Sequence, residues 1–351
     1  MDHMERPSCH GAPEAPPDRL PRVSSPSSPS SPRALPASGV LRFLRGRLAL
    51  WGGTLFLVGL GLLALVVGLW VVGKVGVRPP AFTGALVEAT FGALALGALL
   101  AGFDLFVLYN LMKPPHRLLQ RPVDGLKVAV AYDDEASIGA AVAQFKAHPR
   151  VSSVVVIDNN CRDGTARVAA AAGAEVVTES RQGFGWACRA ALDAAAARGE
   201  IVVLAEGDGT FDARDLDKML AYLVHFDVVM GSRTTRELSS ADSQMDWLLN
   251  PFNQIVAKLL QLRFWGTRLS DVGCTFRVLR REAWERVRGA PLTGGNSFNV
   301  DLAVAWFQAG LRCIELPLSF QARVGVSKGV GTNKRKAAQV ALRMLWTIYT
   351  C

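Results

Sequence analysis

A pair of carboxylates at the end of a predicted strand is the part of this sequence best suited to chemistry. Residues 201–205 are all apolar and predict a buried strand, and Glu206, Gly207 and Asp208 follow it directly. Two hard oxygen ligands suit Mg²⁺ or Mn²⁺, which keeps water ligands and takes others from substrate phosphates. The glycine between them lets the backbone approach a ligand closely. The other interpretation is a solvated turn before an acidic helix start, which the helix dipole favours.

The elements around this pair alternate between strand and helix, which predicts an α/β fold with a parallel sheet covered on both faces. The expected strands are 126–132, 151–158, 174–179, 200–206 and 227–232, and the expected helices are 135–148, 163–173, 185–199 and 215–223. Ligands of such sheets bind beyond the carboxyl ends of the strands. Polar residues stand at these ends, at 132–134, 158–160, 206–208 and 231–233. This placement favours a functional site over a solvated turn.

Two apolar runs precede this region. Residues 48–73 carry no charged side chain, and residues 89–112 carry only Asp104. Each is long enough to cross a bilayer core, which needs about 20 apolar residues of helix, so they predict a transmembrane hairpin; the alternative is a pair of buried core helices. Basic residues flank the pair on both outer sides, whereas the connecting loop has only Lys74 and Arg78, which places both ends and the following domain in the cytoplasm. Asp104 faces a partner helix or polar cavity, or lies near an interface.

The two ends of the chain differ from the rest in composition. Residues 1–40 are rich in proline and serine and predict a disordered tail. Residues 331–351 are basic and then amphipathic, so they either lie on the membrane surface or pack on the preceding domain. The formal net charge of +9 comes without a basic stripe interleaved with aromatics, which favours contact with anionic lipid and no nucleic-acid partner. The six cysteines form no C-x-x-C pair, which predicts reduced thiols in the cytoplasm.

Six short motifs resemble, in order, those of family 2 glycosyltransferases of the GT-A fold, in particular dolichyl-phosphate mannose synthase and related polyprenyl-phosphate sugar synthases. They are VAYDDEASI (130–138), VVVIDNNCRDGT (154–165), EGDGTF (206–211), DVVMGSR (227–233), SDVGCTFRVLRRE (270–282) and LRCIELPLSFQARVGVSK (311–328). The resemblance implies a GT-A type three-layer sandwich with a mostly parallel sheet over residues 122–330. A two-helix transmembrane hairpin with basic flanks, residues 41–121, would precede it.

The resemblance also implies which residues bind the nucleotide of a sugar donor. Tyr132 and Asp134 would touch the nucleotide, and Asp158 or Asn159 would recognise its base. The glycine-rich turn 181–187 has the pattern G-x-G without a third glycine, so it either serves the fold alone or, by analogy with a similar turn of the family, would contact the donor.

The roles implied for the remaining motifs concern phosphates and the reacting sugar. Glu206 and Asp208 would hold the metal on the donor diphosphate, Gly207 between them would contact the donor, and Asp208 would be catalytic. Asp271 would lie near the sugar and acceptor as a second catalytic residue, and it becomes the general base if the acceptor is a hydroxyl. The phosphates would face three cations, Arg233, Arg323 and Lys328. A metal together with such cations stabilises the charge that develops on a diphosphate leaving group.

These observations predict a membrane-anchored glycosyltransferase of the hexosyltransferase type. It would move a sugar from a GDP- or UDP-sugar to a polyprenyl-phosphate acceptor with Mg²⁺ or Mn²⁺. The alternatives are transfer to a hydroxyl acceptor and a non-catalytic membrane scaffold of the same fold. A sugar nucleotidyltransferase would need a glycine-rich, arginine-bearing first loop, which the YDDEAS segment lacks.

Overall fold

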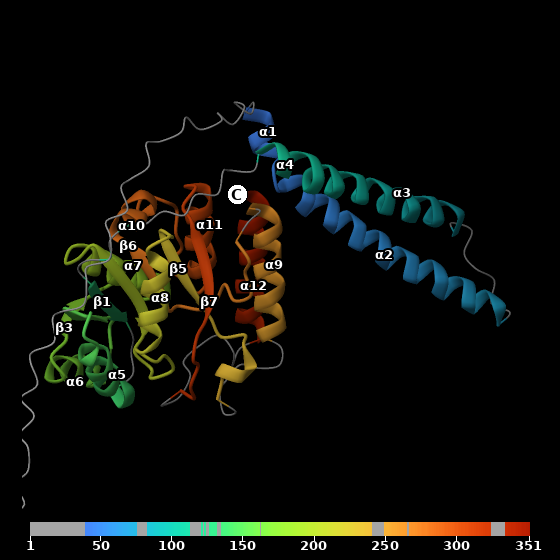
Figure 1. Cartoon of the computed structure of the whole chain (residues 1–351). Helices are drawn as coiled ribbons and strands as arrows, with labels where there is room; N and C mark the ends of the chain where they lie inside the picture. The colour runs from blue at the N-terminus through green and yellow to red at the C-terminus, as the bar shows by residue number, and fades with distance from the viewer. Residues whose placement is uncertain are drawn as a thin grey trace, which may run out of the picture. The chain divides into compact units, whose positions relative to one another are not determined.

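A mixed sheet of seven strands forms the centre of the protein in the computed structural model, with the order β3-β2-β1-β4-β6-β5-β7 (Figure 1). The structure describes residues 39–75, 83–112, 121, 123, 126–131, 135–161, 163–240, 249–264, 267–323 and 334–351. The strands are β1 Leu126–Ala131, β2 Val154–Asp158, β3 Glu175–Thr178, β4 Ile201–Glu206, β5 Val228–Ser232, β6 Arg277–Arg280 and β7 Cys313–Pro317. All the strands listed from the alternating pattern are present. The predicted disordered tail lies outside the described residues except for its last two positions.

The pairing of the strands brings several loops to one edge of the sheet. β1 pairs in parallel with β2 and β4, and β5 pairs in parallel with β7. β6 runs antiparallel to both β4 and β5, with Leu204 and Met230 each opposite Arg277. The sheet is therefore mostly parallel, as expected. The carboxyl ends of β4, β5 and β7 and the amino end of β6 share one edge.

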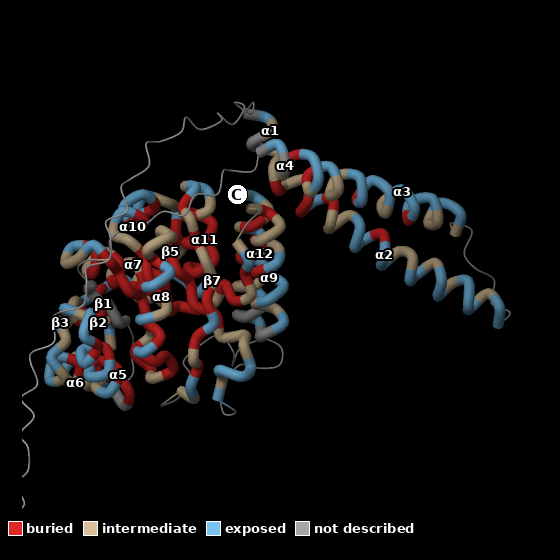
Figure 2. The backbone as a smooth tube through the Cα atoms, in the orientation of Figure 1, coloured by how far each residue is buried: buried red, intermediate tan, exposed pale blue. Residues whose placement is uncertain are grey.

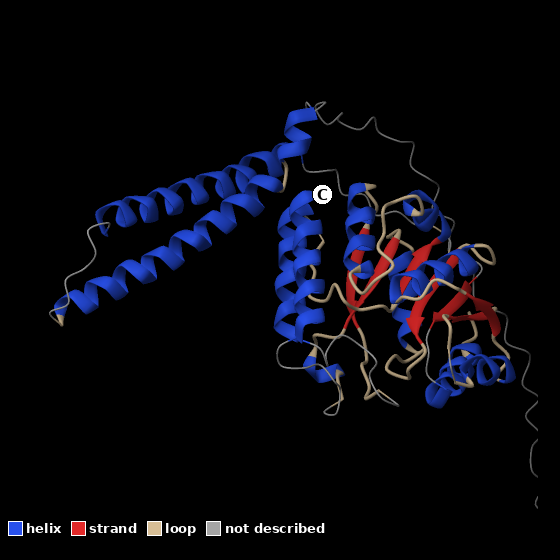
Figure 3. Ribbon diagram, turned by 180° about the vertical axis from the view of Figure 1, so that it is seen from behind, coloured by secondary structure: helices blue, strands red, loops and turns tan. Residues whose placement is uncertain are grey.

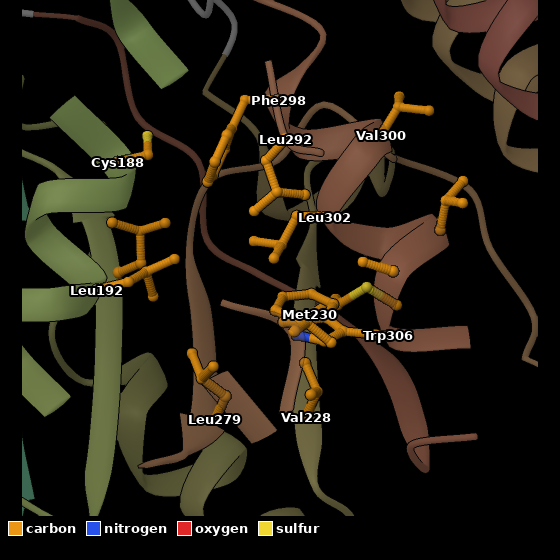
Figure 4. Close-up of a cluster of buried hydrophobic side chains, with 14 of the residues drawn as sticks. Cys188, Leu192, Val228, Met230, Leu279, Leu292, Phe298, Val300, Leu302 and Trp306 are labelled. Atoms are coloured by element: carbon orange, nitrogen blue, oxygen red, sulfur yellow. The ribbon is translucent and has the colours of Figure 1, made fainter. Parts of the chain in front are cut away.

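Helices cover both faces of the sheet, which gives three layers (Figures 1 and 3). Apolar residues of β4 alternate between two hydrophobic clusters, as a strand buried on both faces requires. Val202 and Leu204 belong to one cluster, which also contains the two large side chains Trp284 and Trp306, and Val203 belongs to the other. Figure 4 shows part of the first cluster, and Figure 2 shows the buried strands between the helices.

The helices of the two faces come from different stretches of the chain. One face carries α5 Glu135–Ala147, α6 Thr165–Ala171 and α8 Asp215–Leu223. The other face carries α7 Phe184–Ala196, α9 Leu249–Phe264, α10 Arg281–Val287, α11 Phe298–Gln308 and α12 Lys334–Thr350. A short 3₁₀ helix, Arg236–Leu238, follows β5.

Two long apolar helices, α2 Arg47–Lys74 and α3 Thr83–Gly102, lie side by side (Figures 1 and 3). Glycines allow the close contact, because a Cβ atom at Gly97 would come within 2.6 Å of the Phe56 nitrogen. Both helices are long and apolar enough to cross a membrane, and large side chains such as Leu57 and Leu99 are 66% and 70% exposed. The alternative of two buried core helices is therefore wrong.

Asp104 belongs to a π-helical stretch, Phe103–Leu108, that joins α3 to α4, Tyr109–Met112. Its side chain is fully buried and accepts hydrogen bonds from the backbone nitrogens of Gly46 (3.1 Å) and Ala49 (2.7 Å). These groups lie at the start of α2, where backbone N–H groups have no partner within the helix and carry partial positive charge. Of the roles considered for Asp104, the contact with a partner helix is the one found. A short helix α1, Gly39–Leu44, precedes α2.

Side chains of α9 and α12 contact α2 and the turn that precedes it. Arg263 donates hydrogen bonds to the carbonyl oxygens of Arg45 (3.2 Å) and Cys351 (2.5 Å). The hydroxyls of Thr54 and Tyr349 lie 2.5 Å apart. The base of the hairpin is thus joined to the helical layer by polar contacts.

Helix α12 packs on the preceding domain, which is one of the two arrangements expected for the C-terminal segment. Met344 and Ile348 are buried against the rest of the domain. Leu342 and Trp346 are 67% and 71% exposed. The helix therefore packs on the domain through one side and leaves large apolar side chains outside that contact.

Candidate active site

The turn after β4 holds two carboxylates at the shared edge of the sheet. Thr275, in the loop before β6, donates a hydrogen bond of 2.6 Å from its hydroxyl to Glu206 Oε1. Asp208 Oδ1 accepts from the backbone nitrogen (3.1 Å) and the hydroxyl (2.6 Å) of Thr210. Gly209 adopts a φ of +77°, which favours glycine and lets the chain turn back directly after Asp208. The predicted pair thus occupies a tight turn at the edge where the strand ends meet.

The two carboxylates repel each other. Burial raises the pKa of Glu206 to about 7, and the charge of Asp208 adds to this increase. The hydroxyl of Thr275 and the charge of Arg233 act in the opposite direction. Like charges held together away from water are the condition that a divalent cation relieves, and carboxylate oxygens are the ligands that Mg²⁺ and Mn²⁺ prefer.

These residues therefore fit a metal ion. Among the described residues, no group of three or more His, Cys, Asp or Glu side chains is arranged to hold a metal. The pair Glu206 and Asp208 would supply two protein ligands, a number that suits Mg²⁺-like ions whose other ligands are water and phosphate oxygens.

Arg323 reaches this pair from the segment after β7. Gln321 donates its backbone N–H to the Thr210 oxygen (2.9 Å), and Phe320 forms a β-bridge with Phe211. These contacts carry the segment across the carboxylate turn. The Arg323 Nε atom comes to lie 3.6 Å from Asp208 Oδ2, and its side chain is 14% exposed. Sequence positions more than a hundred residues apart are in this way brought into one charged cluster.

Arg233 and Asp271 form a buried ion pair next to the carboxylate turn. The Asp271 carboxylate accepts from Arg233 Nε (2.7 Å), Nη2 (2.9 Å) and backbone nitrogen (3.1 Å), and also from the Gly273 nitrogen (3.0 Å). Burial alone would raise the pKa of Asp271, but the charge and hydrogen bonds of Arg233 outweigh it and hold the pKa below its usual range. The side chain of Asp271 is completely buried. Its two oxygens are thus occupied by donors.

Glu315 of β7 fixes the backbone of the loop that carries Asp271. Its carboxylate accepts hydrogen bonds from the backbone nitrogens of Ser270 (2.7 Å) and Asp271 (2.9 Å) and from the Ser270 hydroxyl (2.7 Å). The hydroxyls of Ser232 and Thr234 each lie 2.8 Å from that of Ser270. The loop is therefore held from both β5 and β7, and the Arg233–Asp271 pair is rigidly placed.

The two residues expected to recognise the base lie at the end of β2. Asp158 Oδ1 accepts from the backbone nitrogen of Cys161 (2.9 Å). Asn159 is buried and uses its whole carboxamide on the loop after β3: it donates to the oxygens of Glu179 (2.8 Å) and Arg181 (2.7 Å) and accepts from the Gly183 nitrogen (2.9 Å). Asn159 therefore positions this loop, and Asp158 is the better candidate for contact with a base.

The glycines of the turn 181–187 have a packing role in the structure. A Cβ atom on Gly185 would come within 2.2 Å of the Thr293 oxygen, and one on Gly183 within 2.4 Å of the Gly294 oxygen. The Gly185 nitrogen also donates to the Gly294 oxygen (2.9 Å). These glycines allow the start of α7 to contact the loop before α11.

The structure brings five of the predicted side chains, Glu206, Asp208, Arg233, Asp271 and Arg323, to one region. Three predicted residues, Tyr132, Asp134 and Lys328, lie outside the described residues. Three further residues of this region, Thr275, Asn299 and Glu315, were not predicted from the sequence. Thr275 and Glu315 lie within motifs quoted above, so position in a motif was the available signal; Asn299 carries no such signal.

Comparison with known proteins gives consistent similarities. The sequence profile described as "Glycosyl transferase family 2" matches residues 128–288. The chain is 32% identical over 223 residues to an uncharacterized glycosyltransferase of Mycobacterium tuberculosis. The aligned residues make up 62% of this chain and 93% of that protein. It is 27% identical over 207 residues to a dolichyl-phosphate hexose transferase of Haloferax volcanii, with 58% and 86% covered.

A solved structure shows the same fold. The crystal structure described as that of a mycobacterial protein superposes with a TM-score of 0.50 and 22% identity, over 63% of this chain and 74% of that one. At this level of identity the likeness concerns the arrangement of the sheet and helices alone.

Proposed function

The chain belongs to glycosyltransferase family 2, and from this premise we propose that it is a membrane-anchored enzyme that moves a sugar from a nucleotide-sugar donor to a polyprenyl-phosphate acceptor with a divalent cation. Glycosyltransferase activity follows from the family. The donor, the cation, the acceptor and the membrane attachment are the content of the proposal.

The carboxylate turn supports the cation and the donor diphosphate. Glu206 and Asp208 would hold Mg²⁺ or Mn²⁺, which supplies charge stabilisation for the diphosphate that leaves the sugar. Arg323, 3.6 Å from Asp208, is placed to contact a phosphate oxygen of the same group. Asp158 at the end of β2 would contact the base of a GDP or UDP moiety.

The Arg233–Asp271 ion pair is the observation that supports a phosphate acceptor most directly. A hydroxyl acceptor needs a general base, and Asp271 was the candidate for that role. Its oxygens accept four hydrogen bonds, and its pKa is held low by Arg233, so it is poorly suited to take up a proton. We therefore assign Asp271 the role of positioning Arg233. A phosphate acceptor is already an anion, needs little help from a base, and is suited to a fixed guanidinium.

The apolar hairpin supports attachment to a membrane. Its outward side chains, such as Leu57, Phe91 and Leu99, are 63–70% exposed, and lipid rather than water is the favourable surrounding for such a surface. The basic residues outside the two helices favour cytoplasmic ends on both sides. One relative is a dolichyl-phosphate hexose transferase, so a lipid phosphate acceptor for this chain is a reasonable extension.

Transfer can be tested with the purified full-length protein in lipid nanodiscs. GDP- and UDP-hexoses labelled in the sugar are offered with Mn²⁺, with and without a polyprenyl phosphate, and lipid products are identified by mass spectrometry. A hexosyl polyprenyl phosphate is the expected product. Transfer to an uncharged polyprenol or another hydroxyl, with none to the phosphate, would overturn the acceptor assignment. Neither transfer nor donor hydrolysis with any donor would favour a non-catalytic scaffold.

The orientation of the hairpin can be tested independently. A single cysteine introduced at Lys74 of an otherwise cysteine-free variant should react with an impermeant reagent added from outside the cell. A cysteine introduced at the exposed Leu342 of α12 serves as the cytoplasmic control and should react only after permeabilisation. Reaction of both sites from the same side would contradict the proposed topology.

A further inference from the structure

The hydroxyl of Thr275 and the carboxamide of Asn299 form a hydrogen-bonded chain that ends on Glu206. Asn299 Nδ2 lies 3.3 Å from Thr275 Oγ1, and Thr275 Oγ1 lies 2.6 Å from Glu206 Oε1. Both Thr275 and Asn299 are more than nine-tenths buried. Neither side chain has a role in the function proposed above.

The direction of this chain follows from its hydrogen-bonding groups. Asn299 Nδ2 also donates to the backbone oxygen of Gly273 at 2.9 Å, and a carbonyl oxygen can only accept. The carboxamide must therefore present its NH₂ group to Gly273 and to Thr275. Thr275 accepts from Asn299, so its single proton is directed to Glu206.

This orientation leaves the Asn299 Oδ1 atom buried without a hydrogen-bond partner among the described residues. Such an atom costs free energy, because it gives up hydrogen bonds to water without replacing them. Uncompensated buried polar groups are uncommon and occur where a side chain is held for another purpose. Here the contacts indicate that Asn299 is held in this orientation to order the Thr275 hydroxyl.

Arg277 fixes the two backbone segments that carry Thr275 and Asn299. Its buried guanidinium donates to the oxygens of Val272 (3.1 Å) and Cys274 (3.0 Å) in the loop before β6, and to the Asn299 oxygen (3.2 Å) in the first turn of α11. The loop that carries Thr275 and the helix that carries Asn299 are thereby fixed to each other. The spacing between the two side chains does not depend on their own weak contact.

We propose that Thr275 and Asn299 are positioning residues for Glu206, whose carboxylate is held by one oxygen so that the other faces the cation. This inference rests on the metal role proposed for Glu206. Groups that orient a metal ligand without touching the metal commonly change metal affinity by about 10- to 100-fold.

The decisive experiment measures Mn²⁺ binding without catalysis. The full-length protein is titrated with Mn²⁺ in the presence of UDP or GDP, and free Mn²⁺ is counted by electron paramagnetic resonance. Thr275→Val keeps the shape of the side chain and removes the hydroxyl, and it should weaken Mn²⁺ binding about tenfold. Thr275→Ser restores the hydroxyl and should bind within about twofold of the wild type. Melting temperature is recorded for both variants to confirm that each is folded.

A second pair of variants tests the direction of the chain. Asn299→Asp replaces the NH₂ donor by an acceptor, so the Thr275 proton is drawn away from Glu206 and Mn²⁺ binding should weaken. In a Thr275→Val background the same substitution has no hydroxyl through which to act, so the two effects should not add. Additive losses of Mn²⁺ affinity would contradict the proposal that Asn299 acts on Glu206 through Thr275.

Glu206→Gln separates this inference from the proposed function. Loss of Mn²⁺ binding in Glu206→Gln with wild-type binding in Thr275→Val would overturn the positioning role alone. Wild-type binding in Glu206→Gln would overturn the metal role and this inference together. Equal losses in Thr275→Val and Thr275→Ser would show that the methyl packing and not the hydroxyl matters, which also contradicts the proposal.

Discussion

Two carboxylate groups at the same edge of the sheet differ in how their charge is balanced. Asp271 receives four hydrogen bonds, and the charge of Arg233 holds its pKa below the usual range. Glu206 lies beside Asp208, and burial together with that like charge raises its pKa to about 7. Arg323 lies 3.6 Å from Asp208 Oδ2, beyond ordinary hydrogen-bond distance.

This difference separates a structural carboxylate from a ligand-binding one. A carboxylate whose oxygens are already occupied contributes to the fold and orients its partner. A pair that the protein leaves poorly neutralised is destabilised, and a cation supplied with the substrate removes the cost. The contrast predicts that substitutions at the two places affect different quantities.

The largest effect on activity is expected at Asp208. Asp208→Ala removes one of the two proposed metal ligands and should reduce transfer below detection, whereas its free energy of unfolding should change less than that of an Asp271 variant. Glu206→Ala should lose most activity, and Glu206→Asp should be mild because the family pattern has Asp at this position. The measurement is transfer to polyprenyl phosphate across a Mn²⁺ series. Full activity of Asp208→Ala, or of the wild type in excess chelator, would contradict the metal role.

The sequence predicted the carboxylate turn because the features that define it are local. An apolar run predicts β4, and the polar residues directly after it occupy the strand end. The positions that orient Glu206 are remote, since Thr275 lies 69 residues further along the chain, and no local pattern joins them. β6 was not listed among the strands for a similar reason. The apolar run of β6 is short and has an arginine at each end, Arg277 and Arg280. Hydropathy cannot distinguish a buried arginine that donates to backbone carbonyls from a solvated one.

The role expected for Asp271 shows the same limit. The motif predicted it near the reaction, and in the structure its partner Arg233 lies close enough to Glu206 to oppose the rise of the Glu206 pKa. Its pairing with Arg233 could not be predicted from spacing, because the two residues lie 38 positions apart in different loops. Only the contacts indicate a positioning role in place of a general base.

The largest effect on stability is expected at Asp271. Asp271→Asn keeps the shape but removes the carboxylate that pairs with the guanidinium of Arg233, which should lower the free energy of unfolding by about 3–5 kcal/mol. Chemical denaturation of the detergent-solubilised protein measures this. The double variant Asp271→Asn with Arg233→Met should recover part of the loss, since the buried charge is then absent. A single variant as stable as the wild type would place the ion pair in contact with water and remove the basis of the comparison.

Arg323 should have an intermediate effect. If it faces a phosphate, Arg323→Ala should cost about 1–3 kcal/mol of transition-state stabilisation, which corresponds to roughly a tenfold to hundredfold lower kcat/KM. The matched control is Arg214→Ala, which removes an exposed arginine paired with Asp212 and should leave kcat/KM unchanged. Nucleotide affinity measured by calorimetry assigns the contact, because it falls with kcat/KM if Arg323 serves the donor. Unchanged values in both assays would contradict a phosphate role.

The smallest effect, and the one that contrasts the two carboxylates most directly, concerns the stability of the metal-free protein against pH. A raised folded-state pKa means that ionised Glu206 is disfavoured by folding, so its cost is present above about pH 7 and disappears as the pH falls toward its unfolded pKa of about 4.3. Glu206→Gln removes this cost, so its free energy of unfolding at pH 8 should exceed that of the wild type. The gain should be on the order of 1 kcal/mol, a small value because the partly exposed side chain can relax. The difference should vanish near pH 4.

The pKa shift of Asp271 has the opposite sign. Its lowered pKa stabilises the fold above the unfolded value of about 3.9, and this stabilisation is lost as the pH falls through the folded pKa. Thermal unfolding of wild type, Glu206→Gln and Asp271→Asn between pH 4 and 8 should therefore show a difference for Glu206→Gln that grows with pH and a nearly constant difference for Asp271→Asn, whose own pH dependence lies below about pH 3.9. A destabilised Glu206→Gln at pH 8 would mean that Glu206 is a structural carboxylate like Asp271.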